Sequence, residues 1–275
     1  MQTHRFRRAV APAILLLFLA TTAKTQSVGF RDSVIDLSTV YGRFTGAFVG
    51  FDTRSGITYR SNPALCATRL SPASTFKIPN SLIGLETGVI PDEHFVIPWD
   101  GVRRWSGDWN RNHDLASAIK YSVVWYYQEL ARRVGAVRMK HWIDTLGYGN
   151  GDISGGIDRF WLGSSLLISP NEQVIFLNRL RMNAVPFSAR SIEIVKRIIP
   201  QDSGNGWVLH GKTGMADFDS TKAVGWYVGW VDHAEGSFVF ANCLVTRDAQ
   251  RDEEEIFAIR KRISMEILQL LKVIH

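Results

Sequence analysis

Residues 71–80 read Ser-Pro-Ala-Ser-Thr-Phe-Lys-Ile-Pro-Asn and place a hydroxyl, Ser74, three residues before an amine, Lys77. Ser71 is a good N-cap residue and Pro72 suits the first position of a helix, so the stretch predicts a helix whose first turns carry both groups. Side chains three residues apart share one helical face, so the lysine nitrogen can approach the serine oxygen. The sequence therefore predicts a serine nucleophile with a lysine base.

Lys77 can act as a base only when its amine is neutral, and an ordinary lysine titrates near pH ~10.4. We therefore expect apolar burial to lower its pKa, or a chemical reaction to convert the amine. Backbone N–H groups at the helix start would stabilise the negative charge that develops on an attacked carbonyl.

The same spacing recurs at Ser117-Ala118-Ile119-Lys120. This second copy lacks the Ser-Pro start and lies within an amphipathic stretch from Asp114 to Val134. The pattern there favours an exposed lysine and a serine on a helix surface, so the spacing alone does not identify a catalytic pair.

The N-terminus has the features of a secretory signal peptide over residues 1–23. Three arginines precede an apolar run from Ala9 to Ala20, and Thr21-Thr22-Ala23 supplies small residues for cleavage. The run is short for a membrane span, although an uncleaved anchor is the alternative. We expect an exported, periplasmic protein without stable membrane anchoring after cleavage.

Composition indicates one globular unit over residues 24–275, because 45% of the 275 residues are hydrophobic. Without residues 1–23, 29 basic residues face 26 acidic ones, and a net charge of +3 gives no reason to expect a nucleic-acid partner. Cys66 and Cys243 form one disulfide or remain two buried thiols; the strand-like surroundings of Cys243 favour thiols. The histidines show no metal-ligand spacing, so no metal is expected.

The two ends of the chain predict one antiparallel sheet. Residues 47–51 and 57–59 indicate a hairpin, and residues 224–231 and 238–245 indicate two more strands joined by a turn. Apolar residues from Ile256 to Ile274 recur in steps of three and four, which predicts a final helix packed on the sheet.

Residues 91–190 carry mostly helical periodicity. We therefore expect a mixed α/β fold, α+β in the strict sense, in which an antiparallel sheet is flanked by helices. The α/β lobe comprises residues 24–90 and 191–275, and residues 91–190 form an inserted helical lobe. A cleft between the lobes is the expected site.

Three further motifs follow Ser74 in order. Ser122-Val123-Val124 has a second hydroxyl, Tyr148-Gly149-Asn150 is interpreted as structural, and Lys212-Thr213-Gly214 has an ammonium, a hydroxyl and a glycine. This ordered set resembles the penicilloyl serine transferases, and the residues within each motif are similar to those of the class D, oxacillinase-type serine β-lactamases. The resemblance covers nearly all of residues 24–275 and includes residues 72–80, 83–88, 120–124, 128–132, 155–158, 160–162 and 225–231.

The resemblance implies a penicillin-binding-protein/β-lactamase-like fold and a site that hydrolyses β-lactams. Ser74 would be acylated, and Lys77 would carry CO2 as a carbamate and act as general base for acylation and deacylation, with no other cofactor. Ser122 would relay a proton to the departing ring nitrogen. The carbamate would be supported by Val124, Trp161 and Leu162, the tryptophan through its indole N–H.

Substrate binding is assigned by the same resemblance. Lys212, Thr213, Gly214 and Met215 would line the site, with the backbone N–H groups of Ser74 and Met215 as the oxyanion hole. The substrate carboxylate would be held by Thr213 and by the Arg260 guanidinium.

The chain departs from the family pattern at Trp125 and Tyr126, where proline and a smaller residue are common, and at Gly163, where an acid is common. The first departure predicts a narrower cleft mouth, the second a looser loop behind Trp161, and both leave the substrate range open. A penicillin-binding peptidase and a β-lactam sensor domain, each acylated without turnover, are the alternatives, and the oligomeric state stays undetermined.

Overall fold

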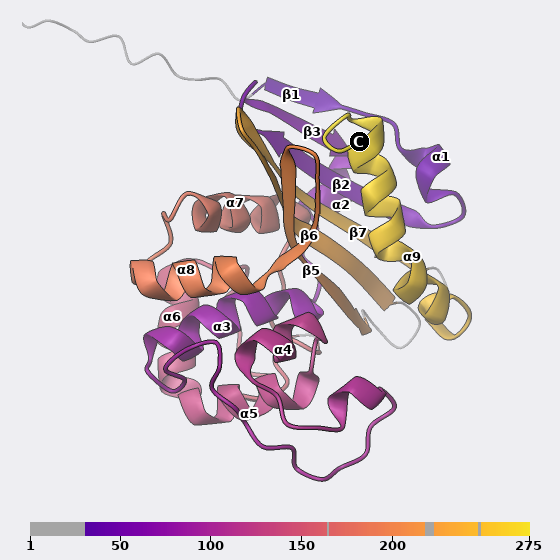
Figure 1. The fold of residues 1–275 in the computed structure, drawn as a ribbon. Helices are drawn as coiled ribbons and strands as arrows, with labels where there is room; N and C mark the ends of the chain where they lie inside the picture. The colour runs from indigo at the N-terminus through magenta and orange to yellow at the C-terminus, as the bar shows by residue number, and fades with distance from the viewer. Residues whose placement is uncertain (1–30, 164, 218–222, 247–248) are drawn as a thin grey trace, which may run out of the picture.

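A seven-stranded sheet forms the centre of the molecule (Figure 1). The computed structural model describes residues 31–163, 165–217, 223–246 and 249–275, so the predicted signal peptide lies outside the described residues. The strands are β1 (Arg31–Val34), β2 (Thr45–Asp52), β3 (Ile57–Ser61), β4 (Pro200–Gly204), β5 (Trp207–Asp217), β6 (Ala223–His233) and β7 (Gly236–Val245). Their order is β1-β3-β2-β7-β6-β5-β4.

The sheet joins the two ends of the chain, as the sequence predicts. β2 and β3 form an antiparallel hairpin, β6 and β7 form another, and β2 pairs with β7 in antiparallel register. Among the described strands, only the short β1 pairs in parallel, with β3. Residues 223–231 of β6 are all buried, because this central strand has helices over both faces.

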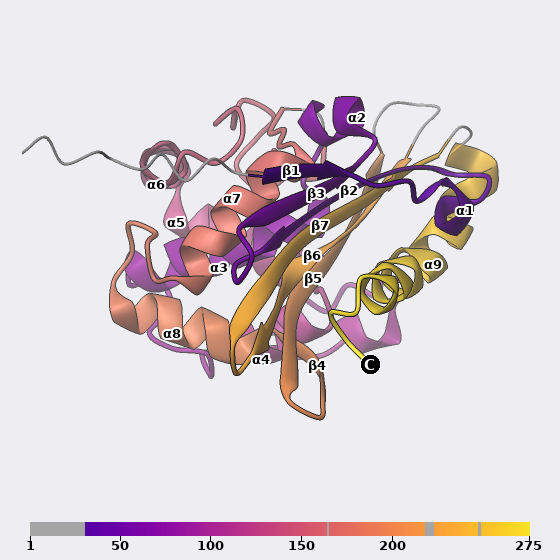
Figure 2. The same ribbon diagram turned by 90° about the horizontal axis from the view of Figure 1, so that it is seen from above.

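Helices cover both faces of the sheet (Figure 2). α1 (Ser38–Tyr41) and the predicted final helix, α9 (Ala249–Leu270), lie on one face. The other elements lie mainly on the opposite side: α2 (Pro63–Ala67), the 3-10 helix η1 (Ala73–Phe76), α3 (Lys77–Glu86), the 3-10 helix η2 (Gly107–Trp109), α4 (Leu115–Lys120), α5 (Val124–Val134), α6 (Ala136–Leu146), α7 (Pro170–Arg181) and α8 (Ala189–Ile198).

Each face of the sheet has its own apolar core. The larger core joins the sheet to α3–α8 and contains Phe76, Trp161 and Trp226. The smaller one lies under α9 and contains Phe240 and Ile263. This is the predicted mixed α/β fold, and within its described residues no helix is long and apolar enough to cross a membrane.

Two local features differ from the pattern of the sequence. The amphipathic stretch over residues 114–134 forms two helices: α4 ends at Lys120 and α5 begins at Val124. Ser122, between them, has a φ of 55°, in the left-handed region that helices do not use. Ser117 also belongs to a capping box with Asp114 and is not a plain surface serine, whereas Lys120 is exposed as expected.

The start of the nucleophile helix also differs. Pro72, and not Ser71, occupies the N-cap position of η1, and no side chain caps this turn. The Ser71 hydroxyl instead donates to the main-chain oxygen of Trp161.

The two cysteines are buried free thiols, the interpretation that the strand pattern favours. Burial raises the pKa of the Cys66 thiol to about 11.

Candidate active site

Ser74 and Lys77 lie together where η1 runs into α3. The lysine Nζ is 2.6 Å from the serine Oγ, as the spacing predicts. Lys77 is fully buried, and its Nζ lies 5.5 Å from the centre of the Tyr127 ring. Burial, and secondly the charge of Lys212, hold the pKa of Lys77 well below the ordinary value for lysine. The neutral amine that base catalysis needs is therefore favoured.

The turn before Lys77 is held by polar contacts that sequence reasoning missed. The Thr75 hydroxyl donates to the main-chain oxygen of Pro72 at 2.7 Å, and Gln173 Nε2 from α7 donates to the same hydroxyl at 2.9 Å. Ala73 has a φ of 50°, which costs a non-glycine residue on the order of 1 kcal/mol or more. This restraint from α7 and the left-handed alanine fix the position of Ser74, and no motif around Gln173 indicated this role.

Ser122 and Lys212 form the second polar pair, from the two sides of the site. Lys212 Nζ donates to Ser122 Oγ at 3.0 Å and to the main-chain oxygen of Thr213 at 3.0 Å. Burial, with a smaller contribution from the Arg260 charge, lowers the pKa of Lys212 to about 7. Lys212 can therefore exchange a proton with Ser122 near neutral pH.

The strand β5 brings the Lys-Thr-Gly motif against the nucleophile turn. β4 covers β5 only as far as His210, so the following stretch of β5 is free to approach η1. A Cβ on Gly214 would come within 3.0 Å of the Pro72 main-chain oxygen and 3.1 Å of Thr75 Cγ2. A larger residue would have to displace these neighbours by a few tenths of an ångström, so glycine favours the close approach that places Thr213 and Met215 with Ser74 in one cleft.

Arg260 reaches the same cleft from α9. Its side chain is 7% exposed, its guanidinium carbon lies 4.0 Å from the centre of the Phe257 ring, and Nη1 donates to the Phe257 main-chain oxygen. Among the described residues, no acid forms an ion pair with it and its Nε has no acceptor. Burial lowers the pKa of Arg260 to about 10. An uncompensated buried cation of this kind is suited to an anionic ligand.

Trp161 provides a test of whether the site fits a carbamate on Lys77. Its ring is fully buried and stacks on Phe76, the neighbour of Lys77, with 5.6 Å between ring centres. Its indole N–H has no acceptor among the described residues. An unpaired buried donor is costly, and the carboxylate group of a carbamate on Lys77 is the kind of acceptor that this donor lacks. The residues present therefore fit a carbamate.

The cleft that these residues line has a volume of about 560 Å³. Ser74, Ser122, Val124 and Leu162 line it together with Arg260. Its remaining lining residues are Trp105, Ser106, Trp109, Lys120, Tyr121, Thr213, Gly214, Met215 and Phe257. All eleven residues predicted for the site thus lie at the cleft or directly behind it, where Lys77, Trp161 and Lys212 are buried.

The mouth of the cleft is aromatic, which sequence reasoning missed. Trp105 is 76% exposed, and its ring centre lies 5.4 Å from that of Trp109 and 6.2 Å from that of Phe257. These contacts link the loop before α4 to α9 across the opening. Trp125, which was expected to narrow the mouth, is instead buried, and its indole N–H donates to the Trp109 main-chain oxygen at 2.8 Å.

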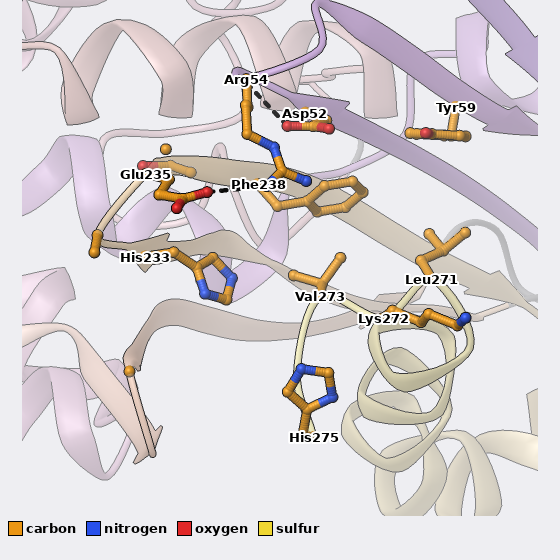
Figure 3. A pocket seen from close by; sticks show the side chains of 14 residues that line it. Asp52, Arg54, Tyr59, His233, Glu235, Phe238, Leu271, Lys272, Val273 and His275 are labelled. Carbon is orange, nitrogen blue, oxygen red and sulfur yellow. Dashed lines mark hydrogen bonds and ion pairs between the residues drawn. The ribbon is translucent and has the colours of Figure 1, made fainter.

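A second hollow of about 410 Å³ lies at another end of the sheet, between the β2–β3 turn, the β6–β7 turn and the end of the chain (Figure 3). Arg54 there pairs with Glu235 at 3.3 Å and binds Asp52 through its main-chain N–H. None of the predicted site residues lines this hollow. Nowhere in the described ranges do three or more His, Cys, Asp or Glu residues gather as a metal site.

Comparisons with known proteins agree with this geometry. A family model described as "Penicillin binding protein transpeptidase domain" matches residues 46–269. The chain is 47% identical over 195 residues to the probable β-lactamase YbxI of Bacillus subtilis, covering 71% of this chain and 72% of that protein. It is 37% identical over 266 residues to the β-lactamase OXA-5 of Pseudomonas aeruginosa, covering 95% and 96%.

Solved structures show the same relationship. The class D β-lactamase from Sebaldella termitidis superposes with a TM-score of 0.84 at 32% identity, covering 89% of this chain and 100% of that one. The span matched by the family model contains every residue predicted for the site.

Proposed function

The chain belongs to the class D serine β-lactamases, and from this premise we propose that it hydrolyses penicillin-type antibiotics through an ester on Ser74, with carbamylated Lys77 as general base. The observation that carries the proposal is the environment of Lys77. Its amine is fully buried and lies 2.6 Å from the nucleophile. Trp161, which stacks on the adjacent Phe76, has an indole N–H with no acceptor in the described part of the chain. A permanently protonated lysine would not serve as a base here.

The carbamate, when formed, supplies an anionic base where the free amine supplies only a neutral one. Trp161 would hold it through the indole N–H, and Val124 and Leu162, both at the cleft, would supply apolar walls beside it.

Acylation starts when Ser74 Oγ attacks the β-lactam carbonyl carbon. A C–O bond forms as the C–N bond of the ring breaks, and the serine proton passes to the base at Lys77, whose Nζ lies 2.6 Å from Ser74 Oγ. Ser122 Oγ, 3.0 Å from Lys212 Nζ, delivers a proton to the departing nitrogen, and the Lys212 ammonium replaces it. Backbone N–H groups at Ser74 and Met215 would stabilise the charge on the carbonyl oxygen.

Deacylation breaks the ester that acylation made. Water adds to the ester carbon, the bond to Ser74 Oγ breaks, and the serine regains its proton. Arg260 and Thr213 would hold the substrate carboxylate throughout, so that the carbonyl stays beside Ser74.

Turnover of benzylpenicillin tests the proposal. We would follow hydrolysis by purified residues 24–275 in bicarbonate buffer, with Ser74→Ala as control and mass spectrometry of the protein. Many turnovers per molecule, lost in the control, are expected. A single stoichiometric acylation that then stalls would refute hydrolysis and favour a penicillin-binding peptidase or a β-lactam sensor. We further propose that the protein is exported to the periplasm and confers β-lactam resistance.

A further inference from the structure

Ser71 stands where a serine would cap the following helix, but its hydroxyl does something else. It donates to the Trp161 main-chain oxygen at 3.1 Å, across a sequence separation of 90 residues. The η1 turn is left without a side-chain cap. A serine at this position usually caps the helix that follows it. Because Ser71 does not, although the turn carries Ser74, we take its hydroxyl to be needed for the contact with Trp161.

Ser71 is itself fixed from the sheet. The buried Trp226 on β6 donates its indole N–H to the Ser71 main-chain oxygen at 2.9 Å. The serine therefore connects a rigid central strand to the loop that carries Trp161. It is buried, so the hydrogen bond from its hydroxyl to Trp161 does not compete with solvent.

The loop that carries Trp161 has another tie near Ser71. Leu70 and Ile168 exchange two main-chain hydrogen bonds of 3.0 and 2.8 Å. Those bonds hold the end of the loop, seven residues after the tryptophan. Gly163, directly beyond Leu162, is exposed and offers no side chain that could fix the turn from outside. Among the described residues, the Ser71 hydroxyl makes the side-chain hydrogen bond to the main chain of Trp161 itself.

We propose that Ser71 is a positioning residue, whose hydroxyl holds the Trp161 main chain so that the unpaired indole N–H stays available to the carbamate of Lys77. The inference rests on the proposed function, because it requires Lys77 to take up CO2. Loss of the hydroxyl would free the tryptophan main chain while leaving Lys77, Ser74 and the cleft unchanged. The expected result is a weaker affinity for CO2, with little change in catalysis once the carbamate has formed.

The test measures carbamate formation directly. Wild type, Ser71→Ala and Ser71→Thr are equilibrated with isotopically labelled bicarbonate, and the carbamate carbon is titrated by NMR, with Lys77→Ala as the blank. The bicarbonate concentration for half occupancy should rise roughly two- to tenfold in Ser71→Ala, the ratio that corresponds to one lost hydrogen bond. The same factor should appear in the bicarbonate dependence of kcat, and Ser71→Thr should restore both.

If Ser71 had only a structural role, Ser71→Ala would lower thermal stability without changing bicarbonate affinity. The matched control is Ser191 on α8. It is a buried serine whose hydroxyl donates to Glu86 at 2.7 Å. Ser191→Ala should lower thermal stability without changing bicarbonate affinity. If Ser71→Ala does not fold, Ser71→Cys retains the side-chain volume with a much weaker donor and takes its place.

Two outcomes overturn the proposal, and they are distinguishable. If wild type takes up labelled CO2 and Ser71→Ala takes it up with equal affinity, the positioning role is refuted while the proposed function stands. If wild type takes up none, the proposed base is wrong and the inference falls with it.

Discussion

Arg260→Met should separate catalysis from stability. The guanidinium is buried, lies over Phe257, and has no acid in an ion pair with it in the described part of the chain. Burial lowers the pKa of Arg260 to about 10, which puts the penalty on its charged form at about 3 kcal/mol, since each tenfold change in acidity is worth about 1.4 kcal/mol. Methionine fills similar space without that penalty.

The magnitudes follow from what the substitution removes. The cation–π contact and the hydrogen bond to the Phe257 main-chain oxygen together offset about 1–2 kcal/mol of the burial penalty. The free energy of unfolding should therefore stay unchanged or rise by about 1–2 kcal/mol. Loss of a charge-assisted bond to the substrate carboxylate removes about 1.5–3 kcal/mol, which lowers kcat/KM roughly 10- to 150-fold.

The assay compares two substrates and two variants. kcat/KM is measured with benzylpenicillin and with its methyl ester, which lacks the carboxylate charge, and stability is measured by urea denaturation. The matched control is Arg262→Met on the same helix, because Arg262 is exposed and 3.8 Å from Glu266. An equal loss of kcat/KM with the acid and with the ester would refute recognition of the carboxylate by Arg260. A fall of several kcal/mol in the free energy of unfolding would refute the view that the Arg260 charge is uncompensated.

Further predictions concern the base, its support and the cleft mouth. Lys77→Ala should abolish turnover, and in wild type bicarbonate should restore activity lost at low pH; full activity of the variant would contradict the mechanism. Trp161→Phe, which keeps most of the ring but removes the N–H, should raise the bicarbonate concentration for half-maximal kcat, and an unchanged value would argue against that donor. The pKa of Lys212 is about 7, lowered by burial and then by Arg260, so kcat/KM for anionic substrates should fall as pH rises above 7 and its charge is lost. In Arg260→Met the residual activity should decline at a higher pH, because the Arg260 charge no longer lowers the pKa of Lys212. If the decline in kcat/KM occurs at the same pH as in wild type, Lys212 is not the group that causes it. Trp105→Ala should raise KM for benzylpenicillin with little change in kcat, because the exposed ring lines the mouth away from Ser74; steady-state kinetics in which only kcat falls would contradict this.

The sequence predicted the sheet and the site motifs well because both depend on local patterns. Alternating and continuous apolar runs identified the β2–β3 and β6–β7 hairpins, and Ser74 to Lys77 is a short-range relation that a helix start imposes. The break at Ser122 was not predictable, since the helical periodicity on both sides continues through a residue whose φ of 55° is set by its tertiary position.

Contacts between distant segments were the other part that sequence reasoning missed. Gln173 reaches Thr75 from a different helix, Ser71 reaches Trp161 across 90 residues, and Trp105 meets Phe257 across the cleft. Glutamine, serine and tryptophan at such positions carry no local signal, because their partners are fixed only when the lobes pack together. A serine before a helix even predicts the wrong partner, its own helix.

The buried groups at the cleft share one electrostatic property. Lys77, Lys212 and Arg260 all have a lowered pKa, and within the described residues none of them forms an ion pair with an acid. The Trp161 indole N–H adds an unpaired donor. Burial of three basic groups and of a donor without an acceptor disfavours the folded state, and the large cores on both faces of the sheet offset this cost. In the proposed function two anions would supply acceptors for these groups, namely a carbamate on Lys77 and the substrate carboxylate at Arg260. Binding of such anions would pair groups that the fold leaves without partners, so the free-energy cost of burying these groups and the affinity of the site for an anion have the same physical cause.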